Sequence, residues 1–470
     1  MRFAFSKNGA IALALCAASL LFFPQQALAQ LSTASVTGAV RDPSGASVPD
    51  AQVALRNLDT AVERRAATNA AGNYVFVSVP PGRYSLEIGK AGFRSTQIPE
   101  LTLEVNQTAT ADATLAVGAV QQTVEVAASA EMIQSATAEL GAVISEKQVV
   151  DLPLNGRNFT QLLSLTPGAA PINGPQQSNG FGNTAIGTAY SFPAFNGQQN
   201  RSNFFMTDGL NNQAAFASTY VVPPIIDDVQ EFKVNSHNDQ AEFGGSLGGI
   251  VNVVTKSGTN EYHGDLWEYL RNTDLNARGT FDPAVTPFHQ NQYGVTFGGP
   301  VSIPKLYDGH NKTFFFFGYE SFRYSQSNFG FIRVPTPLEL SGNFTGPNEP
   351  KQIFNPFTTR PDPSNPNVFI RDPFPGNIIP QSLLDPRMVS YAQALLPKPV
   401  FTGVSDRNAI NTDPTIQAQD EYTGRVDQNI GTKNFIWFRW SNIILDQVLA
   451  TNLPGLDENT HNPGLNWGLS

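Results

Sequence analysis

The sequence predicts a mainly β protein with a β-sandwich, then a mixed α+β domain, then amphipathic strands of a membrane β-barrel. Three observations support this order. Residues 35–118 contain short alternating runs separated by turn signals, as in a sandwich. Residues 145–258 combine two short helical patterns with Gly-rich bends, and residues after 259 form longer, aromatic alternating runs. A length of 470 residues fits two to four domains.

The N-terminus has the features of a secretory signal over residues 1–29. A basic start is followed by an apolar core and a small-x-small site at residues 27–29. The alternatives are an uncleaved anchor helix, for which the apolar run is short, and a lipoprotein signal through Cys16, for which Leu15 is too bulky. Cleavage near Gln30 would remove Cys16, the single cysteine, and leave no thiol chemistry.

Charge and hydropathy narrow the class of protein further. The chain has 29 basic and 39 acidic residues and no block of Lys or Arg, so nucleic acid is not an expected partner. No run of 18 consecutive apolar residues follows the signal. An exported chain of this kind is therefore expected to be soluble or to span the outer membrane with β-strands.

Residues 30–118 are expected to form the β-sandwich. The alternating apolar residues of its strands share one face, and Pro, Gly and Asp mark the turns between strands. The expected inward-facing residues are Val36, Val40, Val53, Leu55, Tyr74, Phe76, Tyr84, Leu86 and Ile88, with a further strand carrying Leu101, Leu103 and Val105. The sandwich is expected to be either a folded spacer or a sugar-binding domain.

Residues 119–144 are expected to connect the sandwich to the next domain. Ser145 and Gln148 then form a capping box for a short helix, and a second helix places Phe159, Leu162 and Leu163 on one face. The segment 203–209, NFFMTDG, predicts a strand that runs into an Asp-Gly turn. Residues 229–264 predict a strand, a Gly-rich bend, a stiff second strand and a turn.

Residues 259–470 have the alternation of barrel strands. In EYTGRVDQNI, the residues Glu421, Thr423, Arg425, Asp427 and Asn429 share one face, and Tyr422, Gly424, Val426 and Ile430 share the other. In a barrel the polar face lines the lumen and the apolar face meets lipid. Residues 335–419 are rich in Pro, Asn and Asp and predict a long extracellular loop. About five candidate strands follow Tyr262, so the expected barrel is incomplete and this sequence is expected to be the front portion of a longer protein.

Three sets of motifs resemble known families. G-x-V-x-D-x-x-G-x-x-V-P, A-G-x-Y-x-F and P-P-G-x-Y-x-L in residues 38–86 resemble the carboxypeptidase-regulatory-like domain, a prealbumin-like sandwich grouped with carbohydrate-binding-like folds. The segment QTVEVA at 122–127 resembles a TonB box, although a plain linker strand explains it as well. LPLNGRNF, LTPG, AEFG and VTKSGTN resemble the plug of TonB-dependent outer-membrane receptors, with the Oar-like branch as the nearest group.

The resemblance implies roles for particular residues. The TonB-type energy-coupling partner would bind Thr123, Val124, Glu125, Val126 and Ala127. Structural or gating positions of the plug (145–258) would be Asn155, Gly156, Arg157, Asp208, Gly209, Gly244, Gly245, Gly248 and Gly249. Loops within 335–419 would contact the solute, and the N-terminal domains would lie in the periplasm.

The expected function is that of an outer-membrane receptor that takes up a scarce solute, a metal chelate or a glycan. The alternatives are a surface structural or adhesion protein on the same scaffold, and a secreted carbohydrate-binding protein. The five histidines are scattered, and no metal-site, nucleophile or phosphate-loop motif is present in the sequence. We therefore expect no enzyme activity, no metal site and no cofactor.

Overall fold

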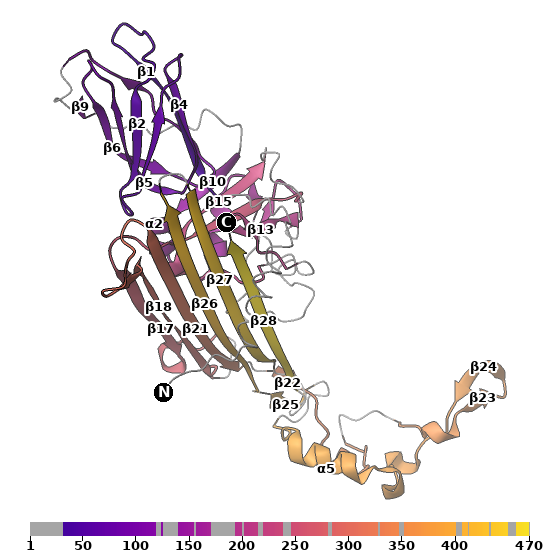
Figure 1. Ribbon diagram of the computed structural model, residues 1–470. Helices are drawn as coiled ribbons and strands as arrows, with labels where there is room; N and C mark the ends of the chain where they lie inside the picture. Colours follow the sequence, from indigo (N-terminus) through magenta and orange to yellow (C-terminus); the bar gives the residue numbers. More distant parts are fainter. Residues whose placement is uncertain are drawn as a thin grey trace, which may run out of the picture.

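The computed structural model describes most of the chain after residue 31 (Figure 1). The described residues are 32–118, 124–125, 140–154, 157–170, 193–199, 202–214, 220–237, 246–280, 284–327, 330–346, 352–400, 407–411, 413–431, 434–449 and 457–469. The expected secretory signal lies outside them. Within these ranges, no helix has both the length and the apolar character needed to cross a membrane.

The first part is a sandwich of two sheets around one apolar core. One sheet contains β1 (Ala34–Arg41), β4 (Asn73–Val79), β7 (Thr108–Thr110) and β8 (Ala113–Thr114). The other has the order β3 (Glu63–Ala67), β2 (Gln52–Asn57), β5 (Gly82–Gly89), β6 (Thr96–Leu103), β9 (Val124–Glu125). All nine residues expected to face inward, from Val36 to Ile88, are buried in this core, so the alternation predicted from the sequence is confirmed.

One expectation for the sandwich is wrong in detail. Val105 was expected on a strand with Leu101 and Leu103, but β6 ends at Leu103 and Val105 lies in the turn that follows. The physical reason is a competing partner for the backbone, because the N–H of Val105 donates to the Glu231 carboxylate at 2.6 Å. That hydrogen bond takes the place of a ladder bond within the sheet.

The second part, here called the plug, is a five-stranded sheet covered by short helices. Its strand order is β10 (Leu140–Ser145), β15 (Val229–His237), β16 (Ile250–Thr255), β13 (Phe204–Thr207), β14 (Leu210–Asn211). Its helices are α2 (Glu146–Asp151), η2 (Phe159–Leu165) and η4 (Ile226–Asp228), and β11 (Ala169–Ala170) pairs with β12 (Ala194–Phe195). Residues from η2, β13 and β15, including Phe159, Phe205 and Phe232, form its core.

The predicted helices and strands of the plug are confirmed, with two corrections. Most of the Gly-rich bend predicted between β15 and β16 lies outside the described residues. Ser145 caps α2 in a capping box with Gln148, as expected. The second helix, η2, buries the expected residues but is a 3-10 helix. The segment assigned to the connector, 119–144, contains the first residues of β10, which pair antiparallel with β15. β10 therefore belongs to the sheet, because its pairing covers an edge of β15 that would otherwise have unpaired backbone groups.

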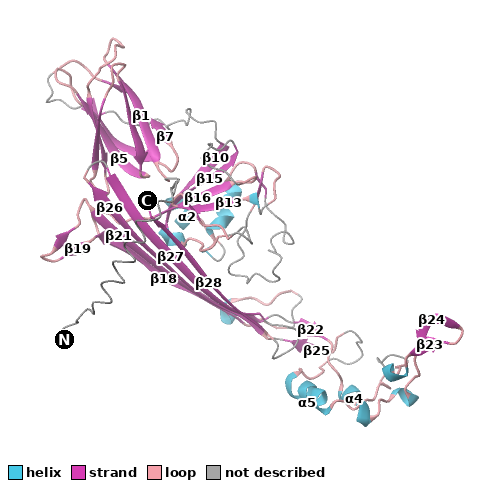
Figure 2. Cartoon of the chain, turned by 45° about the vertical axis from the view of Figure 1, so that its right-hand side comes forward, coloured by secondary structure: helices cyan, strands magenta, loops and turns pink. Residues whose placement is uncertain are grey.

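The third part, here called the barrel sheet, is a six-stranded antiparallel sheet with consecutive strands as neighbours. Its strands are β17 (His263–Asn272), β18 (Phe288–Pro300), β21 (Thr313–Ser327), β26 (Pro414–Ile430), β27 (Asn434–Leu449) and β28 (Glu458–Leu469). Among the described residues β17 and β28 are edges, so the sheet is not closed. The plug lies against one face of this sheet, and the sandwich lies beyond one end of its strands (Figures 1 and 2).

The expected loop bounds need correction. The described part of the sheet has six strands where about five were expected, and β26 begins at Pro414, so residues 414–419 are not loop. The connection between β21 and β26, here called the loop arm, extends away from the sheet (Figure 1). It contains β22 (Gly330–Ile332), α4 (Pro337–Leu340), η6 (Pro356–Thr358), β23 (Arg360–Asp362), β24 (Asn365–Ile370), η7 (Pro375–Asn377), η8 (Gln381–Leu383), α5 (Pro386–Leu395) and β25 (Ala409–Asn411).

Connections between barrel strands differ in length at the two ends of the sheet. Toward the sandwich, residues 301–312 join β18 to β21 and carry β19 (Ser302–Ile303) and β20 (Tyr307–Asp308), and residues 431–433 join β26 to β27. The opposite end carries the loop arm and the connection with η5 (Thr273–Leu275). Outer-membrane barrels have short periplasmic turns and long extracellular loops.

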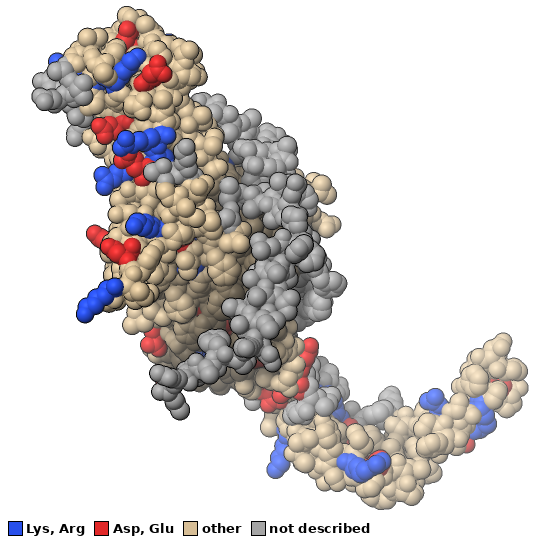
Figure 3. All heavy atoms as spheres, viewed as in Figure 1, with Lys and Arg blue, Asp and Glu red and all other residues tan. Residues whose placement is uncertain are grey.

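The two faces of the barrel sheet have opposite chemistry. The face toward the plug buries polar and charged residues, among them Glu421, Thr423, Arg425 and Asp427. The other face exposes large apolar residues: Leu266, Leu270, Tyr293, Phe297, Phe317, Val426, Ile436, Phe438, Trp440, Leu465, Trp467 and Leu469. Charged side chains gather on the sandwich, along one margin of the sheet and on the loop arm (Figure 3).

Candidate functional site

The tight turn at Asp208 and Gly209 presents a plug carboxylate to the barrel sheet. Both residues have positive φ, 51° and 78°, between the paired strands β13 and β14. This is the conformation that an Asp-Gly turn allows at low cost. The N–H and hydroxyl of Thr255 donate to the two carboxylate oxygens of Asp208, at 2.9 and 2.8 Å. Hydrogen bonds within the plug alone are therefore enough to orient the Asp208 carboxylate.

Two arginines of the barrel sheet bind that carboxylate from the other side. Arg425 Nη1 lies 3.1 Å from Asp208 Oδ1, and Arg439 Nε lies 2.8 Å from Oδ2. The guanidinium of Arg425 is also paired with Asp427, at 2.9 Å. All four side chains are buried, and two positive charges balance two negative ones. We call these four residues the Asp208 cluster.

Further hydrogen bonds hold the Asp208 cluster in place. Arg425 Nη1 also donates to the carbonyl oxygen of Thr255 at 2.9 Å, and Ser257 Oγ donates to Asp427 at 2.6 Å. Arg439 donates to Ser441 and to Asn466. Buried charges are tolerated when they are paired and hydrogen-bonded in this way, and removing one partner is strongly destabilising. The cluster therefore ties the plug to β26 and β27.

In a second buried cluster the plug supplies the positive charge and the barrel sheet the negative one. Here the plug supplies Arg157, which pairs with Asp227 of the plug and lies 3.6 Å from Glu320 Oε2 of β21. Its guanidinium donates to the Tyr269 hydroxyl at 2.9 Å and lies over the rings of Tyr269 and Trp267, both on β17. We call this the Arg157 cluster. It connects the plug to the first barrel strands, whereas the Asp208 cluster connects it to later ones.

Burial also changes the protonation of plug carboxyls at this contact. Burial raises the pKa of Asp227, although the nearby Arg157 and Lys256 act in the opposite direction. The adjacent Asp228 is fully buried, and this burial raises its pKa to about 8. The carboxylates of Asp227 and Glu320 add to the same shift. The raised pKa favours the protonated form of Asp228, which lowers the cost of holding it beside other acids.

The structure places the nine expected plug residues in different settings. Arg157, Asp208 and Gly209 lie at the contact with the barrel sheet, as described above. Gly248 and Gly249 are places of close approach, because a Cβ at either position would collide with Asn203 or with the Phe195 ring. Asn155, Gly156, Gly244 and Gly245 lie outside the described residues.

The sandwich contacts the plug through a turn that rests on β15. Glu231 accepts the N–H of Val105, and Lys233 Nζ donates to the carbonyl oxygen of Asn106 at 3.2 Å. Burial raises the pKa of Glu231 to about 8, and Glu104 adds to the shift. A cavity of about 1310 Å³ remains between the sandwich, the plug and the near end of the barrel sheet. No local sequence pattern indicates this junction.

Two residues of the expected TonB box are described. Val124 and Glu125 form β9, which pairs in parallel with Thr96 and Gln97 at the edge of the sandwich. Thr123, Val126 and Ala127 lie outside the described residues.

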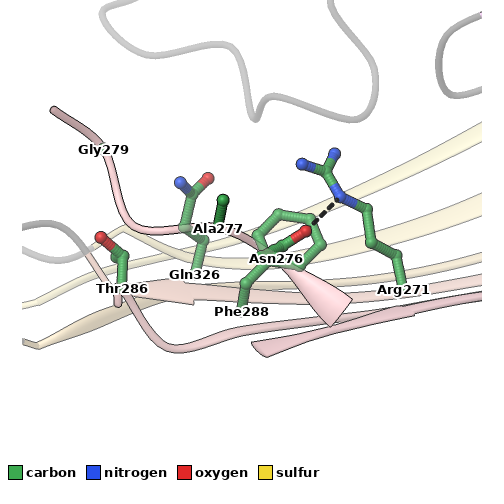
Figure 4. A pocket seen from close by; sticks show the side chains of 7 residues that line it. All are labelled: Arg271, Asn276, Ala277, Gly279, Thr286, Phe288 and Gln326. Carbon is green, nitrogen blue, oxygen red and sulfur yellow. Dashed lines mark hydrogen bonds between the residues drawn. The ribbon is translucent and has the colours of Figure 1, made fainter. Parts of the chain in front are cut away.

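A small pocket lies on the inner face of the barrel sheet, at the end away from the sandwich. It has a volume of about 380 Å³ and contains Arg271, whose guanidinium stacks over the Phe288 ring at 4.5 Å. Arg271 Nε donates to Asn276 at 3.2 Å, and its two terminal nitrogens point away from the strands (Figure 4). The remaining lining residues are Ala277, Gly279, Thr286 and Gln326, none of them acidic. Sequence reasoning missed this pocket, because its residues match no motif and Gln326 reaches the others only through the pairing of β18 with β21.

Metal chemistry finds no support in the described part of the chain, where no group of three or more His, Cys, Asp or Glu could hold an ion. The two clusters consist of fixed, mutually paired charges. Such an arrangement can hold two parts of a protein together and can be released.

Two family descriptions match parts of the chain. Residues 35–116 match the carboxypeptidase regulatory-like domain, and residues 254–468 match the outer membrane beta barrel domain. The first match falls on the sandwich and the second on the barrel sheet with its loop arm.

Similar proteins include a TonB-dependent transporter, Oar, of Myxococcus xanthus. It is 27% identical over 307 residues, which cover 61% of this chain and 27% of that protein. The ferric enterobactin receptor PfeA of Pseudomonas aeruginosa, solved with enterobactin, has a TM-score of 0.34 at 12% identity, covering 66% of this chain and 34% of that one. A carbohydrate-binding protein of Bacteroides uniformis has a TM-score of 0.16 at 15% identity, covering 18% and 41%. The chain thus spans about a quarter of the length of the Oar transporter.

The sandwich, the plug and the two-faced barrel sheet occur in the order that the motifs predict. The two domain matches and the similarity to the Oar transporter cover these same parts of the chain. The chain is therefore similar to the TonB-dependent, Oar-like outer-membrane receptors, with a carboxypeptidase regulatory-like domain ahead of an outer membrane beta barrel domain.

Proposed function

We propose that this protein is an outer-membrane receptor that takes up a scarce solute with energy supplied by a TonB-type partner. The observation that carries the proposal is the Asp208 cluster, in which a plug carboxylate is clamped by Arg425 and Arg439 of the barrel sheet. The similarity to the Oar transporter supports the same function. A plug held against a membrane-spanning sheet by paired charges would block passage of the solute, and separation of those charges would allow it.

In this proposal the two clusters hold the plug at rest. A pull on the N-terminal side of the plug would have to separate Asp208 from its arginines and Arg157 from Glu320. Both contacts are between fully or largely buried groups, so they resist thermal opening but can re-form without a chemical step. Asp208 and Arg157 thereby act as gating residues, and Gly248 and Gly249 allow the tight approach of β16 to its neighbours.

The partner would bind residues 123–127 by adding a strand to its own sheet. A photo-crosslinking amino acid at Ala127, in the protein as its host produces it, should give an adduct with the TonB-type protein. Val124→Pro should remove the adduct, because proline cannot donate a backbone hydrogen bond. Ser129→Pro, in the same segment but outside the box, serves as the control and should keep it.

The solute would be bound at the far end of the barrel sheet, by the Arg271 pocket and by loops within 335–419. The Arg271 guanidinium is stacked on a ring, and its terminal nitrogens donate no hydrogen bond to the described residues, which suits a carboxylate, a phosphate or an anionic chelate. Host cells can be grown with single iron chelates or oligosaccharides as the limiting nutrient. Arg271→Ala should abolish growth on the preferred nutrient and leave the partner adduct intact.

The same experiments separate the rival functions. An adhesion protein on this scaffold would show no adduct at Ala127 and no growth defect after Val124→Pro. A secreted carbohydrate-binding protein would be found in the soluble periplasm or the medium and would bind glycans through its sandwich. Either result would remove the transporter proposal.

A further inference from the structure

The outer edge of β6 in the sandwich carries a short parallel strand. Thr96 pairs with Val124 and Gln97 with Glu125, so β9 is the last strand of that sheet. These two residues lie at the centre of the segment that resembles a TonB box. The segment proposed to join a sheet of the partner therefore already belongs to a sheet of its own chain.

Only the first residues of β6 can accept a strand. Pro99 has no N–H to donate, and the pairing of β6 with β5 shifts register between Tyr84 and Leu86, which marks a bulge opposite this region. Glu100 beyond it is exposed and charged, which discourages pairing along the rest of the edge. The acceptor site is therefore limited to Thr96 and Gln97.

Only a short segment connects the end of the sandwich to β9. Arg94, just before β6, donates its N–H to Ala116 at 2.8 Å, and Gly118 donates to Gly92 at 3.2 Å. Five residues, 119–123, separate Gly118 from β9. A tether of that length gives the segment a high effective concentration at the edge, so the pairing forms although it is only two residues long.

We propose that the β6 edge of the sandwich is a docking edge that holds Val124 and Glu125 in cis and competes with the TonB-type partner for them. The inference rests on the proposed function. A partner strand that pairs with the edge of β9 facing β6 would need the N–H and C=O groups that this pairing already uses. The partner then binds only the fraction of molecules in which β9 has left the edge, and its apparent affinity falls by that fraction.

The competition can be tested by locking the pair. Apart from Cys16 the chain has no cysteine, so Gln97→Cys with Glu125→Cys places one engineered disulfide at partners in the register. The protein is kept full length in host outer membranes, and the photo-crosslinking residue at Ala127 reports partner binding. Gln52→Cys with Ala67→Cys joins β2 to β3 in the same sheet and is the matched control, because both strands stay paired in either state.

The locked protein should form its disulfide, lose at least about tenfold in adduct yield, and regain it after reduction, whereas the control pair should keep the full yield. Two results would overturn the inference: a disulfide at 97 and 125 with unchanged adduct, or a control disulfide that forms while the test pair does not. A chain that gives no adduct even without engineered cysteines contradicts the proposed function itself, and the two failures are thus distinguishable.

Discussion

The sandwich and the barrel sheet use the same alternation with opposite chemistry. In β4 of the sandwich, Phe76 is 6% exposed and its neighbour Val77 is 64% exposed. In β26 of the barrel sheet, Arg425 is 9% exposed and its neighbour Val426 is 44% exposed. One strand hides an aromatic ring and the other hides a guanidinium. Alternation of apolar and polar residues along a strand shows only that the two faces of the sheet differ. Whether the apolar face is buried or exposed depends on whether the surrounding medium is water or lipid.

The two regions are also stabilised by different interactions. The sandwich depends on apolar burial around one core, whose energy grows with the area removed from water. The inner face of the barrel sheet depends on paired charges that reach it from the plug. A substitution that is mild in one region should therefore be severe in the other, and neighbouring residues on one strand should respond in opposite ways.

The largest effect is expected from Arg425→Met. It leaves Asp208 and Asp427 buried without their shared cation, which costs about 3–5 kcal/mol. The plug should loosen, and host cells should become sensitive to a glycopeptide antibiotic too large for an intact outer membrane. Arg360→Met in the loop arm is the control. Its partner Asp372 is about half exposed, so the loss should be about 0–1 kcal/mol and sensitivity should not change.

Phe76→Ala tests the other side of the comparison. Removal of a buried ring from the sandwich core should cost about 3–5 kcal/mol. Thermal unfolding of the purified full-length protein should show an earlier transition of the sandwich with the barrel unaffected. Val77→Ala, one residue along, should shift that transition by no more than about 0.5 kcal/mol. Equal effects at the two positions would contradict the assignment of the core.

Val426→Arg tests whether the exposed face meets lipid. An arginine at the bilayer midplane of a barrel costs about 2–4 kcal/mol, and one near the membrane boundary costs about 0–1. The fraction of protein inserted in the outer membrane should therefore fall for Val426→Arg and remain high for Ile430→Arg at the end of the same strand. Similar insertion of both variants would mean that this face meets water.

Glu231 at the sandwich–plug junction should make stability depend on pH. Its folded-state pKa of about 8 lies above its ordinary value of 4.5, so its contribution is fully present below pH 4.5 and is lost as the pH rises through 8. Glu231→Gln keeps the acceptor for Val105 without a charge. At pH 9 it should be more stable than the unchanged protein by on the order of 2 kcal/mol, and at pH 4 the two should be alike. Glu100→Gln, at an exposed site on β6, should leave the profile unchanged.

Features set by neighbouring residues could be predicted from the sequence. The alternation of Tyr74 and Phe76, the capping box at Ser145, the turn at Asp208 and the polar face of β26 all depend on spacings of a few residues. The structure has them where the sequence predicts them. Arg425 and Asp208 were both singled out, each for a local reason.

Features set by tertiary contact could not be predicted. Arg425 and Asp208 are 217 residues apart, and no local pattern indicates that they meet. Likewise the sequence of β28, ENTHNPGLNWGL, is polar and contains proline, and it is a strand because β27 pairs with it along its length. The pairing of β9 with β6 is of the same kind, because a two-residue strand exists only through its neighbour.

The most direct test of the central claim is to locate the protein that its host makes and to compare its gel mobility with and without boiling. If the barrel sheet faces lipid with its apolar side, the protein will be found in the outer membrane, and the unboiled sample will migrate differently from the boiled one. A product found only in soluble periplasm or medium, with one mobility under both conditions, would contradict the account.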